Sequence, residues 1–145
     1  MAQEQVNDIA LMSIKPIYVD AILSGEKKVE FRKQRFKRNV EYVVIYSTSP
    51  VKRIVGYFSI SYIKTARPNE LWKEYEEIAG LDEPSFREYF RGHEHAVAIE
   101  IGDVTNLLKP FPLSEIFKEI NPPRSFCYIS KNSFERLMAK ISRNS

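Results

Sequence analysis

The chain contains one cysteine, Cys127, and two histidines, His93 and His95, among its 145 residues. A single thiol excludes a framework of intrachain disulfides. Zinc takes three or four ligands, and the sequence offers no partner set to complete a site with these three residues. We therefore expect no metal and no cofactor. Cys127 follows Phe126 in an apolar setting, where a free cysteine ordinarily packs rather than reacts.

No apolar run approaches the ~18 uninterrupted residues that a membrane-spanning helix needs. Residues 1–9 also lack the basic-then-apolar order of a secretory signal peptide. Together with the single cysteine, this predicts a cytoplasmic protein with no membrane association. The hydrophobic fraction of 43% is typical of a globular chain. We expect a frayed or disordered terminus over residues 1–8 and a single domain over residues 9–145.

Positive charge is concentrated in one segment of the chain. Residues 26–38 contain seven Lys or Arg against two Glu, a local balance of +5, whereas the whole chain carries +3. The rest therefore carries about −2, and the basicity is a patch. Such a patch attracts phosphate-bearing partners, although a solvated loop of basic residues is the plain alternative.

Short apolar runs alternate with helical patterns along the chain. Strands are expected at residues 9–14, 26–33, 40–47, 54–63 and 95–104, with Gly56 marking a bulge or a close backbone approach. Helices are expected at 16–24, 68–79, 84–91, 113–117 and 130–141, with Gly25 ending the first and Asn69 a possible cap of the second. This order predicts an α+β fold, a small barrel of five or six mostly antiparallel strands with helices inserted between them.

The strand expected after Gly25 carries alternating residue types. Val29 and Phe31 share one face, while Glu30 and Arg32 share the other. Two apolar residues facing inward would direct the charged pair outward or into a polar cavity. Lys27 lies at the corner between helix and strand, so parity does not determine its direction.

Residues 22–32 read Ile-Leu-Ser-Gly-Glu-Lys-Lys-Val-Glu-Phe-Arg and resemble the signature of the ASCH domain family. That signature is Gly-x-Lys-x-x-Glu-x-Arg behind a short helix, and it falls here on Gly25, Lys27, Glu30 and Arg32. Residues 45–56, 89–101 and 122–126 are similar to later parts of the same family. The resemblance spans about residues 11–128. It implies a PUA-like β-barrel and RNA binding, coupled in some members to RNA modification or to control of translation or transcription.

The resemblance also implies two enzymatic alternatives. Some small members hydrolyse an acylated cytidine, and others have been proposed as ribonucleases. In the amidohydrolase branch a threonine nucleophile stands at the position of Glu30, with a lysine matching Lys27. Because this chain has Glu30 there, hydroxyl-based acyl transfer does not carry over directly. Whether the protein is an enzyme stays open, and binding without catalysis is the favoured hypothesis. If it is an enzyme, Lys27 and Glu30 are the candidate catalytic residues.

An ionic cluster on a barrel wall gains little net stability, because desolvation offsets the Coulomb attraction. Lining a ligand site is therefore the favoured role of Lys27, Glu30 and Arg32, and a structural salt-bridge cluster is the alternative. We predict RNA or a nucleotide-like ligand as the partner. DNA is not excluded and the oligomeric state is undetermined. The predicted binding residues are Lys15, Lys27, Glu30, Arg32, Lys33, Arg35, Lys37, Arg38, Thr48 and Ser49.

Aromatic residues near the patch offer stacking surfaces for a base. Tyr46, Tyr57, Phe58 and Tyr62 lie on the strands expected at 40–47 and 54–63. A base stacked on an exposed ring contributes ~1–3 kcal/mol. Most of these rings are expected in the core, with one of them exposed as a platform.

Overall fold

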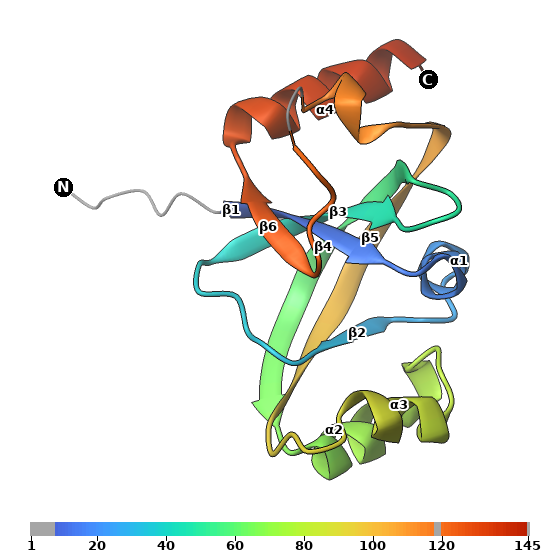
Figure 1. Ribbon diagram of the computed structural model, residues 1–145, viewed down its shortest axis with the longest axis vertical. Helices are drawn as coiled ribbons and strands as arrows, with labels where there is room; N and C mark the ends of the chain where they lie inside the picture. The colour runs from blue at the N-terminus through green and yellow to red at the C-terminus, as the bar shows by residue number, and fades with distance from the viewer. Residues whose placement is uncertain (1–7, 118–119, 145) are drawn as a thin grey trace, which may run out of the picture.

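The computed structural model describes residues 8–117 and 120–144, and Figure 1 shows their arrangement. One sheet of six strands runs through the molecule in the order β2-β5-β4-β3-β1-β6. The strands are β1 (Asp8–Ile14), β2 (Val29–Arg32), β3 (Val40–Ser47), β4 (Arg53–Ala66), β5 (Ala96–Phe111) and β6 (Phe126–Ile129). The helices are α1 (Pro16–Ser24), α2 (Pro68–Tyr75), α3 (Glu83–Tyr89) and α4 (Lys131–Asn144), with 3-10 turns η1 (Glu76–Ile78) and η2 (Leu113–Glu115).

The α+β class and the six strands confirm the fold expected from the sequence. Within the described residues, β1 and β3 pair in parallel and the other four pairings are antiparallel. The sheet is not closed, because no backbone ladder joins β2 to β6 in the described part of the chain. It is thus barrel-like rather than a complete barrel.

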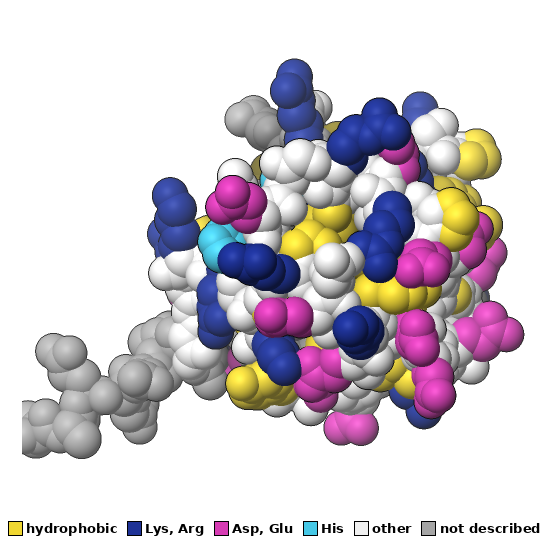
Figure 2. Space-filling model, turned by 90° about the horizontal axis from the view of Figure 1, so that it is seen from below, with side chains coloured by type: hydrophobic (Ala, Val, Ile, Leu, Met, Phe, Trp, Pro, Cys, Tyr) yellow, Lys and Arg dark blue, Asp and Glu magenta, His cyan; other side chains and the backbone are white. Residues whose placement is uncertain are grey.

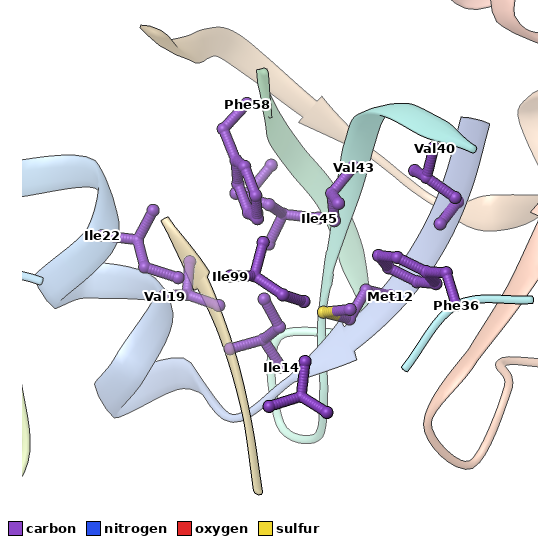
Figure 3. Packing of buried hydrophobic residues seen from close by; sticks show 13 residues of the cluster. Met12, Ile14, Val19, Ile22, Phe36, Val40, Val43, Ile45, Phe58 and Ile99 are labelled. Carbon is purple, nitrogen blue, oxygen red and sulfur yellow. The ribbon is translucent and has the colours of Figure 1, made fainter. Parts of the chain in front are cut away.

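Side chains from the loop after β2 cover the open seam. Phe36 packs edge-on against Phe126 of β6, with ring centroids 4.7 Å apart. The backbone amide of Lys37 donates to the Tyr128 hydroxyl at 2.9 Å. Figure 3 shows Phe36 pointing into the cluster that also contains Met12 and Val40. Apolar packing therefore replaces the missing strand pairing at this edge.

Three apolar clusters hold the elements together. The first fills the inside of the curled sheet under α1 and includes Ile22, Phe58 and Ile99 (Figure 3). The second lies between the opposite face of the sheet and α4. The third joins α2 and α3 to β2 and β5, with Phe31 packed against Phe86 at 4.9 Å. In Figure 1, α2 and α3 accordingly lie together, away from α4.

Most local expectations match the structure. Gly25 has φ +87 and ends α1 in the left-handed conformation. Gly56 lies at a register shift between β4 and β5, and a Cβ there would fall 2.4 Å from the Thr105 carbonyl oxygen. Asn69 does not cap α2, because Arg67 occupies that position and Asn69 lies in the first turn. Strand β6 was not expected, since proline-rich residues 120–125 precede it.

The ends of the chain lie partly outside the described residues. Residues 1–7 of the terminus that we expected to fray are among those not described, as are 118–119 and 145. Asp8, which we had assigned to that terminus, begins β1 opposite Val40. Among the described helices, none has the length and apolar character needed to cross a membrane.

Candidate functional site

A cavity of about 1140 Å³ opens beside β2. Its walls come from five separate parts of the chain: the end of β1 with the start of α1, the corner at Lys27 with strand β2 and the loop after it, the turn after β3, helix α3 with residues on either side of it, and the segment before β6. Six of the ten predicted binding residues line it, namely Lys15, Lys27, Glu30, Arg32, Lys33 and Thr48. The motif that carried the prediction therefore does face a cavity.

The strand parity of β2 places the charged pair in this cavity. Glu30 pairs with Ile99 and Arg32 with Val97, both in the cluster inside the sheet. Directly opposed residues of an antiparallel pair share a face. Val29 and Phe31, by contrast, belong to the cluster under α2 and α3. One face of this edge strand therefore packs against helices α2 and α3, and the other face lines the cavity.

Lys27 is buried at the back of the cavity, with 2% of its surface exposed. Its Nζ donates to the Ala79 carbonyl oxygen at 2.5 Å and lies 3.7 Å from Glu30 Oε1. Burial lowers the pKa of the Lys27 ammonium; the Glu30 carboxylate opposes this shift and the Arg32 guanidinium adds to it. This lysine is thus closer to giving up its proton than a surface lysine.

Glu30 lies between the two cations and is itself buried, with 6% exposure. Its Oε2 accepts from Arg32 NH2 at 3.0 Å, and its Oε1 faces Lys27. A carboxylate removed from water needs such partners, because an unpaired buried charge is costly. The arrangement leaves Glu30 able to accept a further hydrogen bond from a ligand, since each carboxylate oxygen has two lone pairs.

Arg32 bridges the open seam of the sheet. Its NH2 donates to the Ser13 carbonyl oxygen of β1 at 2.9 Å as well as to Glu30, and its NH1 donates to Ser125 Oγ at 3.2 Å. Its Nε is buried and has no hydrogen-bond partner among the described residues. The guanidinium therefore connects β2 to β1 and to the segment before β6 while one of its donors stays unused.

Exposed cations surround the mouth of the cavity. Lys15, Lys33 and Arg124 line it and are exposed to solvent. Including Lys27 and Arg32, five cations face two carboxylates, Glu30 and Glu88, which gives the lining a net charge of +3 with His93 neutral. The cavity is therefore positive at its rim and has a carboxylate at its floor.

Two tyrosines of the lining were not predicted as site residues from the sequence. Tyr18 of α1 lies with its ring centroid 5.4 Å from Lys27 Nζ, and Tyr89 of α3 lies 4.5 Å from Lys33 Nζ. Burial raises the pKa of the Tyr89 hydroxyl, with Glu30 acting in the same direction and Arg32 against it. Tyr89 is 38% exposed, so its ring presents a surface to the cavity.

The aromatic platform expected on β3 or β4 does not line this cavity. Phe58 and Tyr46 are buried, with 0% and 5% exposure. Tyr57 packs against Phe134 of α4, on the opposite side of the sheet from the first cluster. Tyr62 is 58% exposed but is not among the residues that line the cavity.

Four of the predicted binding residues lie outside the cavity. Arg35 donates to Thr65 Oγ1 at 3.1 Å, and Arg38 lies over the Tyr128 ring with Asp8 3.9 Å away. Lys37 is exposed on the same loop, and Ser49 is exposed in the turn after β3, before the cis bond to Pro50. Counting charges along the sequence predicted one basic patch. In the structure Lys27, Arg32 and Lys33 of this patch line the cavity, whereas Arg35, Lys37 and Arg38 of the loop after β2 do not.

Other lining residues come from segments that we had assigned no role. Ser85, Glu88 and Tyr89 lie on α3, and Arg124 and Ser125 precede β6. The resemblance at residues 89–101 and 122–126 was the available signal for both segments. Within the described residues, no group of three or more His, Cys, Asp or Glu side chains is placed to hold a metal ion.

Comparison with known proteins places the chain among relatives of the same architecture. The ASCH domain family model matches residues 12–105. A curated protein of Zymomonas mobilis named "ASCH domain-containing ribonuclease" is 33% identical over 138 residues, 92% of this chain and 93% of its own length. The crystal structure of ASCH from Zymomonas mobilis aligns with a TM-score of 0.84 at 32% identity, covering 90% of this chain and 94% of that one.

A more distant likeness concerns the fold alone. The N-terminal domain of Staphylothermus marinus McrB aligns with a TM-score of 0.63 at 11% identity, over 97% of this chain and 98% of that one. The sheet with its inserted helices is thus shared well beyond recognisable sequence similarity.

Proposed function

The chain belongs to the ASCH domain family, and from that premise we propose that it is an RNA- or nucleotide-binding module whose ligand enters the cavity beside β2. The observation that carries this proposal is the cavity lining. The buried Lys27 and Glu30 form its floor together with Arg32, whose side chain is 12% exposed, and exposed cations surround its mouth. Replacing a buried ion cluster by packed apolar residues is often neutral or stabilising, so stability alone is a weak reason to keep one.

Each part of the lining suits one part of a nucleotide. Lys15, Lys33 and Arg124 at the mouth attract phosphates. The Tyr89 ring offers a stacking surface to an unpaired base, the mode by which single-stranded RNA is commonly held. Glu30 at the floor accepts from an exocyclic amine, as carboxylates do from cytosine N4. The proposed ligand is therefore single-stranded RNA, or an RNA loop, with one base inserted into the cavity.

Binding to short single-stranded and hairpin RNAs over a salt series tests this proposal. The variant Lys15→Ala/Lys33→Ala/Arg124→Ala removes three mouth cations, and Arg35→Ala/Lys37→Ala/Arg38→Ala removes the same charge from the loop outside. For single strands the logarithm of affinity falls with that of salt by ~0.7 per neutralised phosphate. A smaller slope in the mouth variant, with the loop variant less affected, supports binding in the cavity. No binding of any RNA at low salt contradicts it.

The comparison of these two triple variants also decides a point that the sequence left as a prediction. Phosphate contacts by Arg35, Lys37 and Arg38 remain a proposal, since these residues are exposed but are not among those that line the cavity. A loss of slope confined to the loop variant assigns the phosphates to the loop. In that case the cavity would hold only the base, or a small ligand.

Ribonuclease activity is a second candidate function, favoured by the name of the Zymomonas mobilis relative. In RNA cleavage the 2′-hydroxyl gives its proton to a base as its oxygen bonds to the adjacent phosphorus, and the P–O5′ bond breaks while the departing 5′-oxygen takes up a proton from an acid or from water. Cations stabilise the charged phosphate during this step. Burial lowers the pKa of Lys27, which favours the neutral amine that such a base requires. Glu30 would orient the reacting groups or exchange a proton. No comparable observation supports acyl-cytidine hydrolysis, because Glu30 replaces the threonine of that branch.

Two coarser proposals accompany this function. We propose that residues 9–145 act as one domain, and that the protein works in the reducing cytoplasm, where Cys127 stays a thiol. RNA is the proposed nucleic acid; the positively charged mouth by itself does not exclude DNA, so a DNA strand of the same sequence belongs in the binding series as a competitor.

A further inference from the structure

A second, smaller cavity of about 400 Å³ lies on the other side of α3 from the first. It forms where the β4–β5 ribbon ends and α2 begins. Ala66 of β4 pairs with Ala96 of β5, so Arg67 follows one strand just where His95 precedes the other. The end of the ribbon thus brings an arginine and a histidine to one wall of this cavity.

Helix α3 supplies the opposite wall with a second arginine. Arg87 NH2 donates to Glu83 Oε1 at 3.1 Å, and Arg87 NH1 donates to Asn69 Oδ1. These two contacts hold the guanidinium at the cavity, while Glu94 is the acidic residue of its lining. The lining therefore holds two arginines and two histidines against Glu94, while Glu83 beside it pairs with Arg87 and leaves Arg67 as the arginine without an ion pair among the described contacts.

The start of α2 adds a weak positive potential to the same place. Its N-cap, Arg67, makes no side-chain capping hydrogen bond, and Pro68 occupies the first turn. Amides at a helix N-terminus favour an anion, and here the Asn69 backbone amide is the one concerned, because Pro68 has no N–H and the amides of Glu70 and Leu71 donate to the Arg67 carbonyl oxygen. The cavity and its arginines identify the site, and the positive potential at the start of α2 has the same sign as the charge of these arginines.

One residue connects this cavity to the first. His93, just beyond the end of α3, lines both cavities. The exposed surface around α2 and α3 is otherwise mixed, with Lys and Arg side chains interspersed among Asp and Glu (Figure 2). General attraction of a polyanion to this face is therefore weak, and an RNA strand leaving the main cavity would follow the local path past His93.

We propose that the cavity formed by Arg67, Arg87, His93 and His95 is a second subsite, which binds the backbone phosphate of an RNA nucleotide adjoining the one in the main cavity. This subsite rests on the proposed RNA binding and adds a direction to it: the strand passes the C-terminal end of α3. The ligand of the subsite is a phosphodiester, and its base is not read there.

The test is the length dependence of RNA binding. Affinities are measured for oligoribonucleotides of one to eight nucleotides with the wild type and with Arg67→Gln/Arg87→Gln. The matched control is Arg53→Gln/Lys73→Gln, which removes two exposed cations that line neither cavity. Circular dichroism and urea unfolding of each variant show whether its fold is intact.

The proposal expects a step in wild-type affinity, about tenfold, at the length at which the strand enters the second cavity. The step is lost in Arg67→Gln/Arg87→Gln, with the shortest ligands bound as in the wild type, and is kept in the control. A step that survives in the arginine variant, or a loss equal at all lengths, overturns the subsite but leaves binding in the main cavity intact. Absence of binding at every length by the wild type overturns the proposed function together with the subsite.

Discussion

Gly80 lies directly against the side chain of Lys27. A Cβ atom at position 80 would fall 2.4 Å from the Lys27 Cβ and 2.6 Å from its Cγ. Gly80 also has φ +69, and its neighbour Ala79 accepts the hydrogen bond from Lys27 Nζ. The turn after η1 therefore shapes the channel in which this buried lysine lies.

Gly80→Ala should disturb Lys27 as well as strain the backbone. A left-handed alanine costs about 1–2 kcal/mol, and crowding against the lysine adds about 1–3 kcal/mol. Gly92→Ala is the matched control, because Gly92 has φ +79 but nothing within 4 Å of a Cβ. Urea unfolding should show the larger loss for Gly80→Ala. Equal losses would mean that Lys27 moves aside without cost.

The lowered pKa of Lys27 predicts how stability depends on pH. The unfolded chain holds this proton up to its ordinary value of 10.5, whereas the folded chain releases it earlier. Between the two pKa values the unfolded state binds more protons, so this residue makes stability rise with pH. The difference in unfolding free energy between wild type and Lys27→Met should therefore shift in favour of the wild type from neutral pH towards pH 10.

The wild type must be compared with Lys27→Met because other titratable groups make stability fall, not rise, with pH. Burial raises the pKa of Tyr75, whose hydroxyl also donates to Glu100, and burial raises the pKa of Cys127. An unfolded chain loses these protons first, so stability falls as pH rises above their ordinary values. These contributions cancel between the two proteins, and a difference that stays flat with pH would contradict the lowered pKa of Lys27.

Arg32→Lys should weaken the seam of the sheet although it keeps the charge. A lysine ammonium cannot reproduce the fork that contacts Ser13, Glu30 and Ser125 together. We expect a loss of about 2 kcal/mol in urea unfolding, with faster amide exchange in β6 and the end of β1. Ser125→Ala removes a single exposed contact and should cost well under 1 kcal/mol. Arg32→Lys at wild-type stability would show that apolar packing of Phe36 alone holds the seam.

Variants of the two residues at the floor of the cavity, Lys27 and Glu30, distinguish a binding protein from an enzyme. If the protein cleaves RNA through Lys27, Lys27→Met should abolish turnover while RNA affinity stays within a few-fold. If it only binds, Glu30→Gln and the mouth variant should lower affinity, with no cleavage by the wild type. Single-turnover cleavage of a labelled oligoribonucleotide, measured beside its affinity, makes the distinction. Full cleavage by Lys27→Met would exclude this lysine as the base.

Local patterns predicted the parts of the site that are adjacent in sequence. Gly25 as a helix end, the alternation of β2 and the turn at Lys27 all follow from residues within one short segment. Parity alone predicted that Glu30 and Arg32 share the face opposite to Val29 and Phe31, and it left open whether that face meets solvent or a polar cavity. A glycine inside a strand pattern predicted a bulge or a close backbone approach at Gly56, and the structure has both a register shift and a close approach there.

The remaining walls depend on contacts between distant segments. Ser125 reaches Arg32 across 93 positions, and Tyr89 comes from a helix whose pattern shows only which face is buried. Strand β6 has four residues and pairs with β1 at the other end of the chain. Likewise, composition predicted a basic patch but not that Arg35 and Arg38 would turn to Thr65 and Tyr128.

The most direct test of RNA binding in the cavity is a titration of ¹⁵N-labelled protein with a short single-stranded RNA, followed by amide chemical shifts. The account predicts that the largest changes fall on the lining at Lys15, Lys33, Tyr89 and Ser125, with smaller ones at His93. Changes confined to residues 35–38, or to the distant end of the β4–β5 ribbon near Leu108, would contradict it.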